Sequence, residues 1–340
     1  MPQVLVFIIL FLPVYISRES RISNSSALKT QEPVVLYIQE QSSLEEVVDL
    51  LEDLDVELDR EEIRWISGLL GWRNFSIGRY ELDGEYSYEG LLSRLSLGLQ
   101  DHASVTIPSG ATVGRLAATL SRQMKADSLD FAVLFSHESE LLAEFDMSSE
   151  ELFSRMIPDT YNFYWTTAPG NVIKRIYNEF VRRFEERYAE EIEESSLDLN
   201  QLVILASIIE WEAANQEEKA RIGGLYRNRL DRNMRLQADP TVIYAIGEHR
   251  RLLYEDYETD HPYNTYRIRG LPPGPITNPD YVSLRAALFP EEHDYLYMVA
   301  SPGGGHVFSR TFNEHRAASN RWREWIREQY RIRDQRESGN

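Results

Sequence analysis

Residues 202–214 read Leu-Val-Ile-Leu-Ala-Ser-Ile-Ile-Glu-Trp-Glu-Ala-Ala, an apolar helical pattern that carries two glutamates. On a helical wheel the leucines and Ile209 form an apolar stripe, with Glu210 on one flank and Glu212 on the other. Burial among aliphatic side chains disfavours the charged form of a carboxylate, so such a group can donate a proton near neutral pH. The segment therefore predicts a core helix with Glu210 as general acid. The plainer alternative is an edge glutamate that reaches water or pairs with an arginine downstream.

Composition limits the classes of protein that the chain can form. Its 340 residues, 42% of them hydrophobic, are enough for two folded domains. The formal net charge of -19 argues against a basic face for DNA or RNA. The same acidity is also compatible with adaptation to high salt. The absence of cysteine excludes disulfides, thiol catalysis and thiolate metal sites.

The amino terminus carries an apolar run from Val4 to Ile16. Its length of about 13 residues is short against the roughly 20 that span a bilayer as a helix. No basic residue precedes it, whereas Arg18 and Arg21 follow, which is the wrong asymmetry for an anchor that starts inside. We expect residues 1–16 to be a signal peptide or a membrane anchor, with both alternatives open, and residues 17–33 to be a linker.

Residues 34–124 alternate between strand and helix patterns. The first part predicts the order strand, helix, helix, strand at 34–38, 44–54, 60–70 and 76–82. A partial echo follows, with helices at 88–99 and 112–124 around a strand at 104–107. This βααβ order resembles the LysM-like module, which binds peptidoglycan glycan chains. We expect an α+β protein in which a LysM-like βααβ module precedes a mixed α+β catalytic domain.

The segment 125–200 is mostly helical by pattern, with an aromatic loop at 157–165. Its four aromatic rings have two interpretations: they line the floor of a sugar groove, or they cap the core of the domain. We expect residues 125–330 to form the catalytic domain and residues 331–340 to be a tail.

Three further blocks follow the helix, and as a series they are highly specific. They are Leu-Gln-Ala-Asp-Pro-Thr at 236–241, Tyr-Asn-Thr-Tyr at 263–266 and Gly-Leu-Pro-Pro-Gly-Pro-Ile at 270–276. With the Ser-Ile-Ile-Glu-Trp-Glu helix they resemble the endolytic murein transglycosylases of the MltG (YceG-like) family, strongly over about residues 150 to 330. One departure is that Phe153–Met156 stand where members often carry Glu-Gly.

The resemblance implies an activity and a cellular place. It implies a lytic transglycosylase that cleaves peptidoglycan glycan strands between MurNAc and GlcNAc, leaves 1,6-anhydro-MurNAc ends and terminates nascent strands. The family's catalytic glutamate falls on Glu210. The resemblance also implies a single-pass protein of the cytoplasmic membrane with its catalytic domain on the periplasmic side, working beside cell-wall synthesis proteins. No cofactor, metal or nucleic acid is implied.

This chemistry makes one acid sufficient. The C6 hydroxyl of the sugar attacks the anomeric carbon, so the enzyme protonates the leaving oxygen and then accepts the hydroxyl proton. Around Glu210 we expect further side chains to contact substrate. These candidates are Glu212, Gln237, Asp239, Tyr263, Asn264 and Tyr266. For Asp239 the alternative is a helix N-cap before Pro240, and for one of the tyrosines it is core packing.

Two other functions stay open on the sequence. A muramidase-type hydrolase would use Glu210 as acid and Asp239 or Glu212 as second carboxylate. A wall-binding scaffold would need no catalysis. Farther on, 295–308 predicts a hairpin with a glycine-rich tip, and His306 and His315 have no spacing typical of a metal site. An Arg-rich helix is expected from Phe312 to Arg333.

Overall fold

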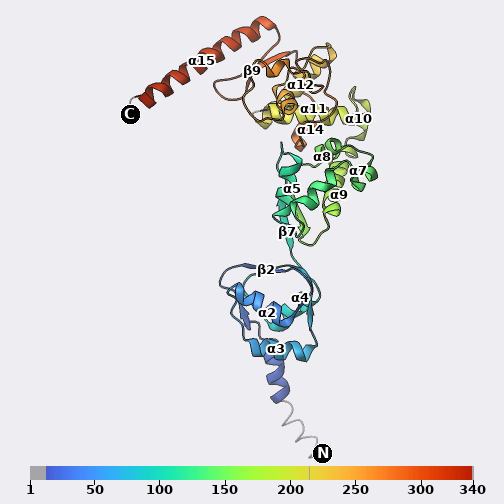
Figure 1. The fold of residues 1–340 in the computed structure, drawn as a ribbon, viewed down its shortest axis with the longest axis vertical. Helices are drawn as coiled ribbons and strands as arrows, with labels where there is room; N and C mark the ends of the chain where they lie inside the picture. The colour runs from blue at the N-terminus through green and yellow to red at the C-terminus, as the bar shows by residue number, and fades with distance from the viewer. Residues whose placement is uncertain (1–12, 214, 339–340) are drawn as a thin grey trace, which may run out of the picture. The chain divides into compact units, whose positions relative to one another are not determined.

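The fold is described by a computed structural model of residues 13–213 and 215–338 (Figure 1). The chain divides into two compact units. The first contains residues up to Val105 together with Ser121–Asp127 and Asn162–Ala168. The second contains Thr106–Leu120, Ser128–Tyr161 and the chain from Pro169 onward. Helices and short strands occur together, so the predicted α+β class is confirmed.

The first unit is built on one antiparallel strand pair. Strand β2 (Val34–Ile38) pairs with β5 (Gly78–Leu82), and helices α2 (Leu44–Asp53) and α3 (Arg60–Leu70) lie between them in the chain. Alternate strand residues are buried because successive side chains point to opposite faces. The predicted order of strand, helix, helix and strand is thereby confirmed.

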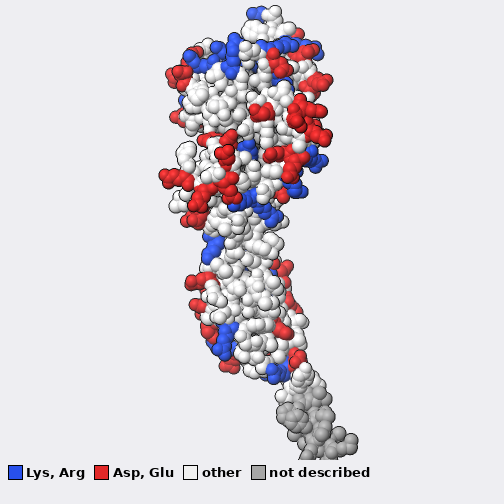
Figure 2. All heavy atoms as spheres, turned by 90° about the vertical axis from the view of Figure 1, so that its right-hand side faces the viewer, with Lys and Arg blue, Asp and Glu red and all other residues white. Residues whose placement is uncertain are grey.

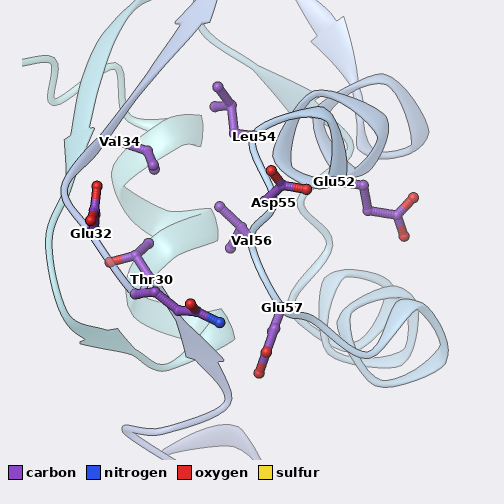
Figure 3. Close-up of a pocket in the computed structure, with 9 residues that line it drawn as sticks. Thr30, Glu32, Val34, Glu52, Leu54, Asp55, Val56 and Glu57 are labelled. Carbon is purple, nitrogen blue, oxygen red and sulfur yellow. The ribbon is translucent and has the colours of Figure 1, made fainter.

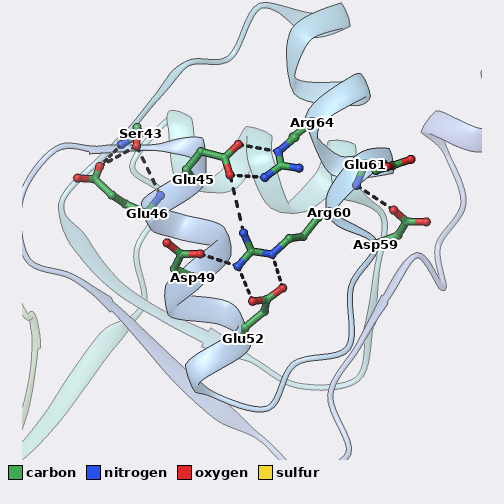
Figure 4. Close-up of polar contacts among 9 residues, drawn as sticks. All are labelled: Ser43, Glu45, Glu46, Asp49, Glu52, Asp59, Arg60, Glu61 and Arg64. Carbon is green, nitrogen blue, oxygen red and sulfur yellow. Dashed lines mark hydrogen bonds and ion pairs between the residues drawn. The ribbon is translucent and has the colours of Figure 1, made fainter.

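Helices α2 and α3 begin at well-made caps. Ser43 and Glu46 form a capping box at the start of α2, and the Asp59 carboxylate accepts two backbone N–H groups at the start of α3. Figure 4 shows Arg60 on α3 bridging to Asp49 and Glu52 on α2. These ion pairs are exposed, so solvent screening keeps their contribution to the stability of the helix pair small.

Smaller elements complete this half of the chain. They are β1 (Leu28–Lys29), β3 (Ser42–Ser43), β4 (Asn74–Phe75), β6 (Glu85–Tyr86), α4 (Tyr88–Ser96) and β7 (His102–Thr106). A pocket of about 660 Å³ opens beside the loop that follows α2. Figure 3 shows its walls, where Val34 and Val56 stand among the acidic side chains Glu32, Asp55 and Glu57.

The second half of the chain is mainly helical. Its elements are α5 (Val113–Ser121), α6 (Ser128–Ala132), η1 (Val133–Phe135), α7 (Glu140–Phe145), α8 (Ser149–Ser154), β8 (Thr160–Tyr164), α9 (Pro169–Phe180), η2 (Val181–Glu185), α10 (Ala189–Glu194), α11 (Leu199–Glu212), η3 (Gln216–Glu218), α12 (Lys219–Asp231), α13 (Asp239–Ile246), η4 (Asp256–Glu258), α14 (Tyr281–Leu288), β9 (Tyr297–Ala300), β10 (His306–Ser309) and α15 (Phe312–Ser338). The predicted hairpin is confirmed, because β9 and β10 pair antiparallel around the glycine-rich turn. The Arg-rich helix continues beyond Arg333 to Ser338.

Helix α11 is the centre of the second unit's core. Every residue from Leu202 to Ile209 is buried, so the helix is covered on all sides over this stretch and its core face is wider than a stripe. Helix α12 approaches α14 closely, because a Cβ on Gly223 would lie 2.3 Å from the Ala286 carbonyl oxygen. The Ser207 hydroxyl accepts the Ile276 N–H, which ties the proline-rich turn to the same helix.

The aromatic segment 157–165 differs from the expected loop. Its residues from Thr160 to Tyr164 form strand β8, which pairs with β7. Tyr161, Phe163 and Trp165 are buried, whereas Tyr164 is exposed. The structure favours the core interpretation for three of the four rings, since strand alternation turns them inward.

The predicted signal or anchor at residues 1–16 falls mostly outside the described residues, which begin at 13. Among the described residues, no helix combines the length and the apolar character needed to cross a membrane. On the face drawn in Figure 2, acidic side chains are widespread and Lys and Arg are interspersed among them.

Candidate active site

Glu210 is buried as predicted, and it is held in an ion-pair network. Its Oε2 accepts from Lys219 Nζ at 2.9 Å, from the Asp280 N–H at 3.0 Å and from Ser283 Oγ at 2.7 Å. Lys219 Nζ also lies 2.8 Å from Asp280 Oδ2. The Glu210 and Lys219 side chains are only 8% and 5% exposed. One oxygen of Glu210 thus ties the end of α11 to the starts of α12 and α14.

Glu212 stands two residues later, on a different side of α11. It lines a polar pocket of about 280 Å³, whereas Glu210 does not. The pocket is surrounded by side chains from α11, α12, α13, the segment before α13, the 263–266 block and the β9–β10 hairpin. Its polar residues are Glu212, Tyr226, Arg229, Gln237, Asp239, Tyr266 and His306.

The pKa of Glu212 is raised to about 7. Burial is the main cause, and the neighbouring negative charge of Asp239 adds to it. The Arg229 guanidinium and the Tyr226 hydroxyl act in the opposite direction and lower the pKa. A carboxyl group with this pKa is protonated in a substantial fraction of molecules at neutral pH, which is the state that a general acid needs.

Arg229 connects three of the segments that line this pocket. Its side chain is buried on α12, and it donates to the Leu296 carbonyl oxygen at 2.6 Å and to the Leu236 carbonyl oxygen at 2.6 Å. These bonds join α12 to the segment before α13 and to the start of the hairpin. Burial lowers the pKa of Arg229, but a guanidinium keeps its proton in proteins. The pocket therefore contains a fixed positive charge beside Glu212.

The block at 236–241 presents two polar residues, Gln237 and Asp239, to the pocket. Gln237 has a φ of 51°, a left-handed backbone conformation that is uncommon for residues other than glycine. Ala238 occupies the N-cap position and Asp239 is the first residue of α13. The N-cap alternative for Asp239 is thus wrong, because its carboxylate accepts from the Tyr266 hydroxyl at 2.6 Å and the Tyr257 hydroxyl at 3.4 Å.

The two tyrosines around Asp239 have strongly perturbed hydroxyls. Burial and the Asp239 charge raise the pKa of Tyr257 to about 12, and the same causes raise the pKa of Tyr266 further. Both phenols consequently remain hydrogen-bond donors. Tyr257 was not expected from the sequence, because it lies in the short helix η4, outside the three blocks.

Asn264 has a different place from the one predicted. Its side chain is fully buried, and its amide donates to the Tyr257 and Thr259 carbonyl oxygens at 3.0 and 2.8 Å. The Asn264 Oδ1 accepts the Tyr266 N–H at 3.0 Å. Asn264 therefore holds the loop that carries both tyrosines, and it does not face the pocket.

Tyr263 also lies away from the polar pocket. Its ring packs against Tyr244 at 4.6 Å between centroids. Burial, with a smaller contribution from Tyr244, raises the pKa of the Tyr263 hydroxyl. A Cβ on Gly274 would lie 2.5 Å from this hydroxyl, so the glycine of the proline-rich turn provides the room for it.

His306 reaches the pocket from the hairpin and is fixed by Glu218. The Glu218 carboxylate accepts the His306 N–H at 2.8 Å, and its second oxygen lies 3.0 Å from His306 Nδ1. Gly305 has a φ of 67°, and a Cβ there would lie 2.4 Å from Glu218 Oε1. The close approach therefore requires glycine at 305. Within the described residues, no group of three or more His, Asp or Glu side chains is arranged to hold a metal ion.

The sequence predicted Glu212, Gln237, Asp239 and Tyr266 as substrate contacts around Glu210, and the structure places these four around one pocket that Glu210 does not line. It missed Arg229, Tyr226 and Tyr257 as members of the same surroundings. A spacing signal exists for Tyr226 and Arg229, because residues three positions apart lie on the same face of a helix.

Taken together, the fold and site define an α+β protein whose helical core presents a carboxyl group of perturbed pKa to a polar pocket. The chain belongs to the YceG-like family, whose model matches residues 36–321. A Bacillus subtilis protein named endolytic murein transglycosylase is 31% identical over 299 residues, covering 83% of this chain and 82% of that protein. A Streptococcus pneumoniae D39 protein of the same name is 26% identical, covering 81% of this chain and 55% of that protein.

A solved structure has a similar fold. The crystal structure of a putative yceG-like protein from Listeria monocytogenes superposes with a TM-score of 0.59 at 28% sequence identity. The match covers 85% of this chain and 99% of the Listeria chain. The α+β architecture is therefore shared beyond the catalytic segments.

Proposed function

We propose that this chain is a lytic transglycosylase that cleaves peptidoglycan glycan strands internally, with Glu212 as its general acid. The observation that carries the proposal is the place of the buried Glu212 carboxyl group in a polar pocket of a family member, where burial raises its pKa to about 7. The names of the relatives, endolytic murein transglycosylases, supply the substrate class.

The surroundings of the two glutamates favour Glu212 over the expected Glu210. Glu210 Oε2 accepts three hydrogen bonds, one of them from a buried ammonium group, so its contacts suit an anion that holds three helices together. Glu212 lines a polar pocket of about 280 Å³, and burial favours its protonated form. The catalytic role expected for Glu210 is in our proposal a structural one.

In the proposed reaction Glu212 transfers the protons and Asp239 stabilises the charge at the sugar. Glu212 gives its proton to the glycosidic oxygen, and the bond from that oxygen to the anomeric carbon breaks. The C6 hydroxyl of the same MurNAc attacks the anomeric carbon and closes the 1,6-anhydro ring, and Glu212, now a carboxylate, takes the hydroxyl proton. The Asp239 carboxylate stabilises the positive charge that develops at the sugar, while the Tyr257 and Tyr266 hydroxyls hold it in place.

Product analysis tests this function against hydrolysis by two carboxylates. Glu212 and Asp239 share the pocket, so a hydrolase that uses both remains the second candidate. Digestion of purified sacculi by the wild-type chain should yield 1,6-anhydro-MurNAc ends. Reducing MurNAc ends would instead identify a hydrolase. A wall-binding scaffold without catalysis would yield neither product and would show the same phenotype with Glu212→Gln.

We propose, as a separate point, that the first unit is a LysM-like module that binds glycan. Its β2, α2, α3 and β5 order and the antiparallel pairing of the two strands support this. The exposed residues Gln31 and Glu32 stand at the pocket of Figure 3. Replacing both with alanine in the full chain should reduce co-sedimentation with insoluble sacculi, and unchanged sedimentation would argue against binding at this pocket.

We also propose that residues 1–16 retain the protein at the cytoplasmic membrane, with the catalytic domain on the cell-wall side, where it terminates nascent strands beside synthesis proteins. The apolar run from Val4 to Ile16 and the substrate class support this. Fractionation of cells followed by protease treatment of the intact membrane surface should place the chain in the membrane fraction and degrade it from the wall side.

A further inference from the structure

A second pocket of about 320 Å³ lies in the same unit and has no part in the chemistry above. Its lining is mostly apolar and strongly aromatic. Phe153 of α8, Trp211 of α11, Tyr244 of α13 and His249 beyond α13 contribute rings, and Glu150 adds a carboxylate.

This second pocket and the candidate active site are lined in part by the same two helices. On α11, Trp211 lines the second pocket and its neighbour Glu212 lines the polar one. On α13, Asp239 lines the polar pocket and Ile243, four residues later on the same face, lines the second. Four residues of helix span about 6 Å. Along the axis of α13, these two lining residues are thus separated by about the length of one sugar unit of a glycan chain.

The aromatic walls are held in place by specific contacts. Gly110 has a φ of 61°, and a Cβ there would lie 2.7 Å from Trp211 Nε1, so only glycine leaves the indole its place. The His249 ring packs edge-on against Trp211 at 5.0 Å between centroids. Tyr244 is supported from behind by Tyr263 at 4.6 Å. The walls are therefore preorganised for a flat ligand.

The chemistry of the lining suits a pyranose ring. The carbon-bound hydrogens on a sugar's face pack against aromatic rings, while its hydroxyls need acceptors at the edge. Glu150 is exposed at this pocket, and its carboxylate has neither a hydrogen bond nor an ion pair to another described residue. Its carboxylate is available to accept from sugar hydroxyls. An enzyme that cuts inside a strand must also hold sugars beyond the bond that it breaks.

We infer that this pocket is a secondary glycan subsite, which binds an N-acetylated sugar of the same strand about one unit along α13 from the cleaved bond. The inference rests on the proposed function, because that function supplies the strand. Tyr263, which lies away from the polar pocket, then contributes to substrate binding indirectly by supporting Tyr244. An apolar peptide or an acyl chain would be a different occupant, and the experiment below separates these from a sugar.

Binding of glycan to the Glu212→Gln protein tests the subsite without cleavage. Peptide-free strands of at least eight sugars are titrated into this protein by calorimetry, alone and with Tyr244→Ala or His249→Ala added. Loss of one aromatic wall should weaken the Kd for long strands by about tenfold for Tyr244→Ala and about threefold for the exposed His249→Ala. Tyr330→Ala removes a half-exposed ring from α15 and serves as the control, with an unchanged Kd.

Two results would overturn the subsite. One is an unchanged Kd for long strands in both pocket variants, which would leave the pocket to another occupant. The other is an equal loss for disaccharides, which are too short to fill both pockets, and for long strands, which would show that Tyr244 and His249 only support the polar pocket. If Tyr244→Ala lowers the Tm so far that titration fails, His249→Ala alone decides. Failure of the proposed function is seen separately, because the wild-type chain would then bind strands without cutting them.

Discussion

Replacing Glu212 and Glu210 by glutamine, one at a time, should separate catalysis from stability. Glu212→Gln removes the proton donor and should lower kcat/KM on purified sacculi by about 10³, within the range typical of general acids. Anhydro-MurNAc ends, separated by liquid chromatography, provide the readout. Glu210→Gln should keep kcat within about tenfold of wild type at temperatures where the chain is folded, because Glu210 does not line the pocket.

The two substitutions should have opposite effects on the free energy of unfolding. Glu212→Gln, which lowers activity, should raise stability, and Glu210→Gln should lower it. In the folded chain the pKa of Glu212 is raised from 4.5 to about 7, which corresponds to about 3 kcal/mol. Because the folded state holds this proton more tightly than the unfolded state, stability falls as pH rises from 4.5 to 7 and stays lower above. Glutamine has no such proton. Glu212→Gln should therefore match the wild type in stability near pH 4 and exceed it by about 3 kcal/mol above pH 7.

Glu210→Gln should instead lower the free energy of unfolding. The substitution leaves Lys219 buried with Asp280 as its remaining anion, and breaking a buried ion pair from one side costs about 3 to 5 kcal/mol. Urea unfolding followed by circular dichroism measures both variants at pH 4 and pH 8. An inactive but fully stable Glu210→Gln protein, together with an active Glu212→Gln protein, would refute the assignment of roles.

Three further predictions concern the surroundings of Glu212. The log of kcat/KM should fall as pH rises through about 7. Asp239→Asn should move this fall to lower pH, since it removes a charge that raises the pKa of Glu212. A fall at the same pH in the variant would contradict the effect of Asp239 on the pKa of Glu212. Gly305→Ala should cost more stability than the matched Gly304→Ala, because both glycines have positive φ but only a Cβ at 305 meets Glu218; equal Tm losses of the two variants would disprove the close approach. Tyr266→Phe should lower kcat by about tenfold with little change in Tm, since it deletes one hydrogen bond to Asp239. An unchanged kcat would show that the reaction does not depend on Tyr266 holding Asp239 in place.

Local sequence signals predicted much of the fold. Period-two and period-3.6 patterns located the strand β2, the helices α2 and α3 and the hairpin of β9 and β10, because these elements bury one face each. The same logic failed at Thr160–Tyr164, where clustered aromatic residues suggested a loop. Strand alternation with β7 buries most of those rings, and that pairing is not visible in the local pattern.

The sequence by itself determined the family, the core helix α11 and a short set of polar residues, since motif order and hydrophobic pattern are properties of the chain. Only the tertiary structure decided which glutamate faces the pocket. Glu210 and Glu212 lie two positions apart, about 200° around the helix, so the neighbours of each come from other elements. Lys219 and Asp280 enclose Glu210, whereas Asp239 and Arg229 surround Glu212. Such surroundings are made by packing between distant segments, and packing sets the charge state that the chemistry requires.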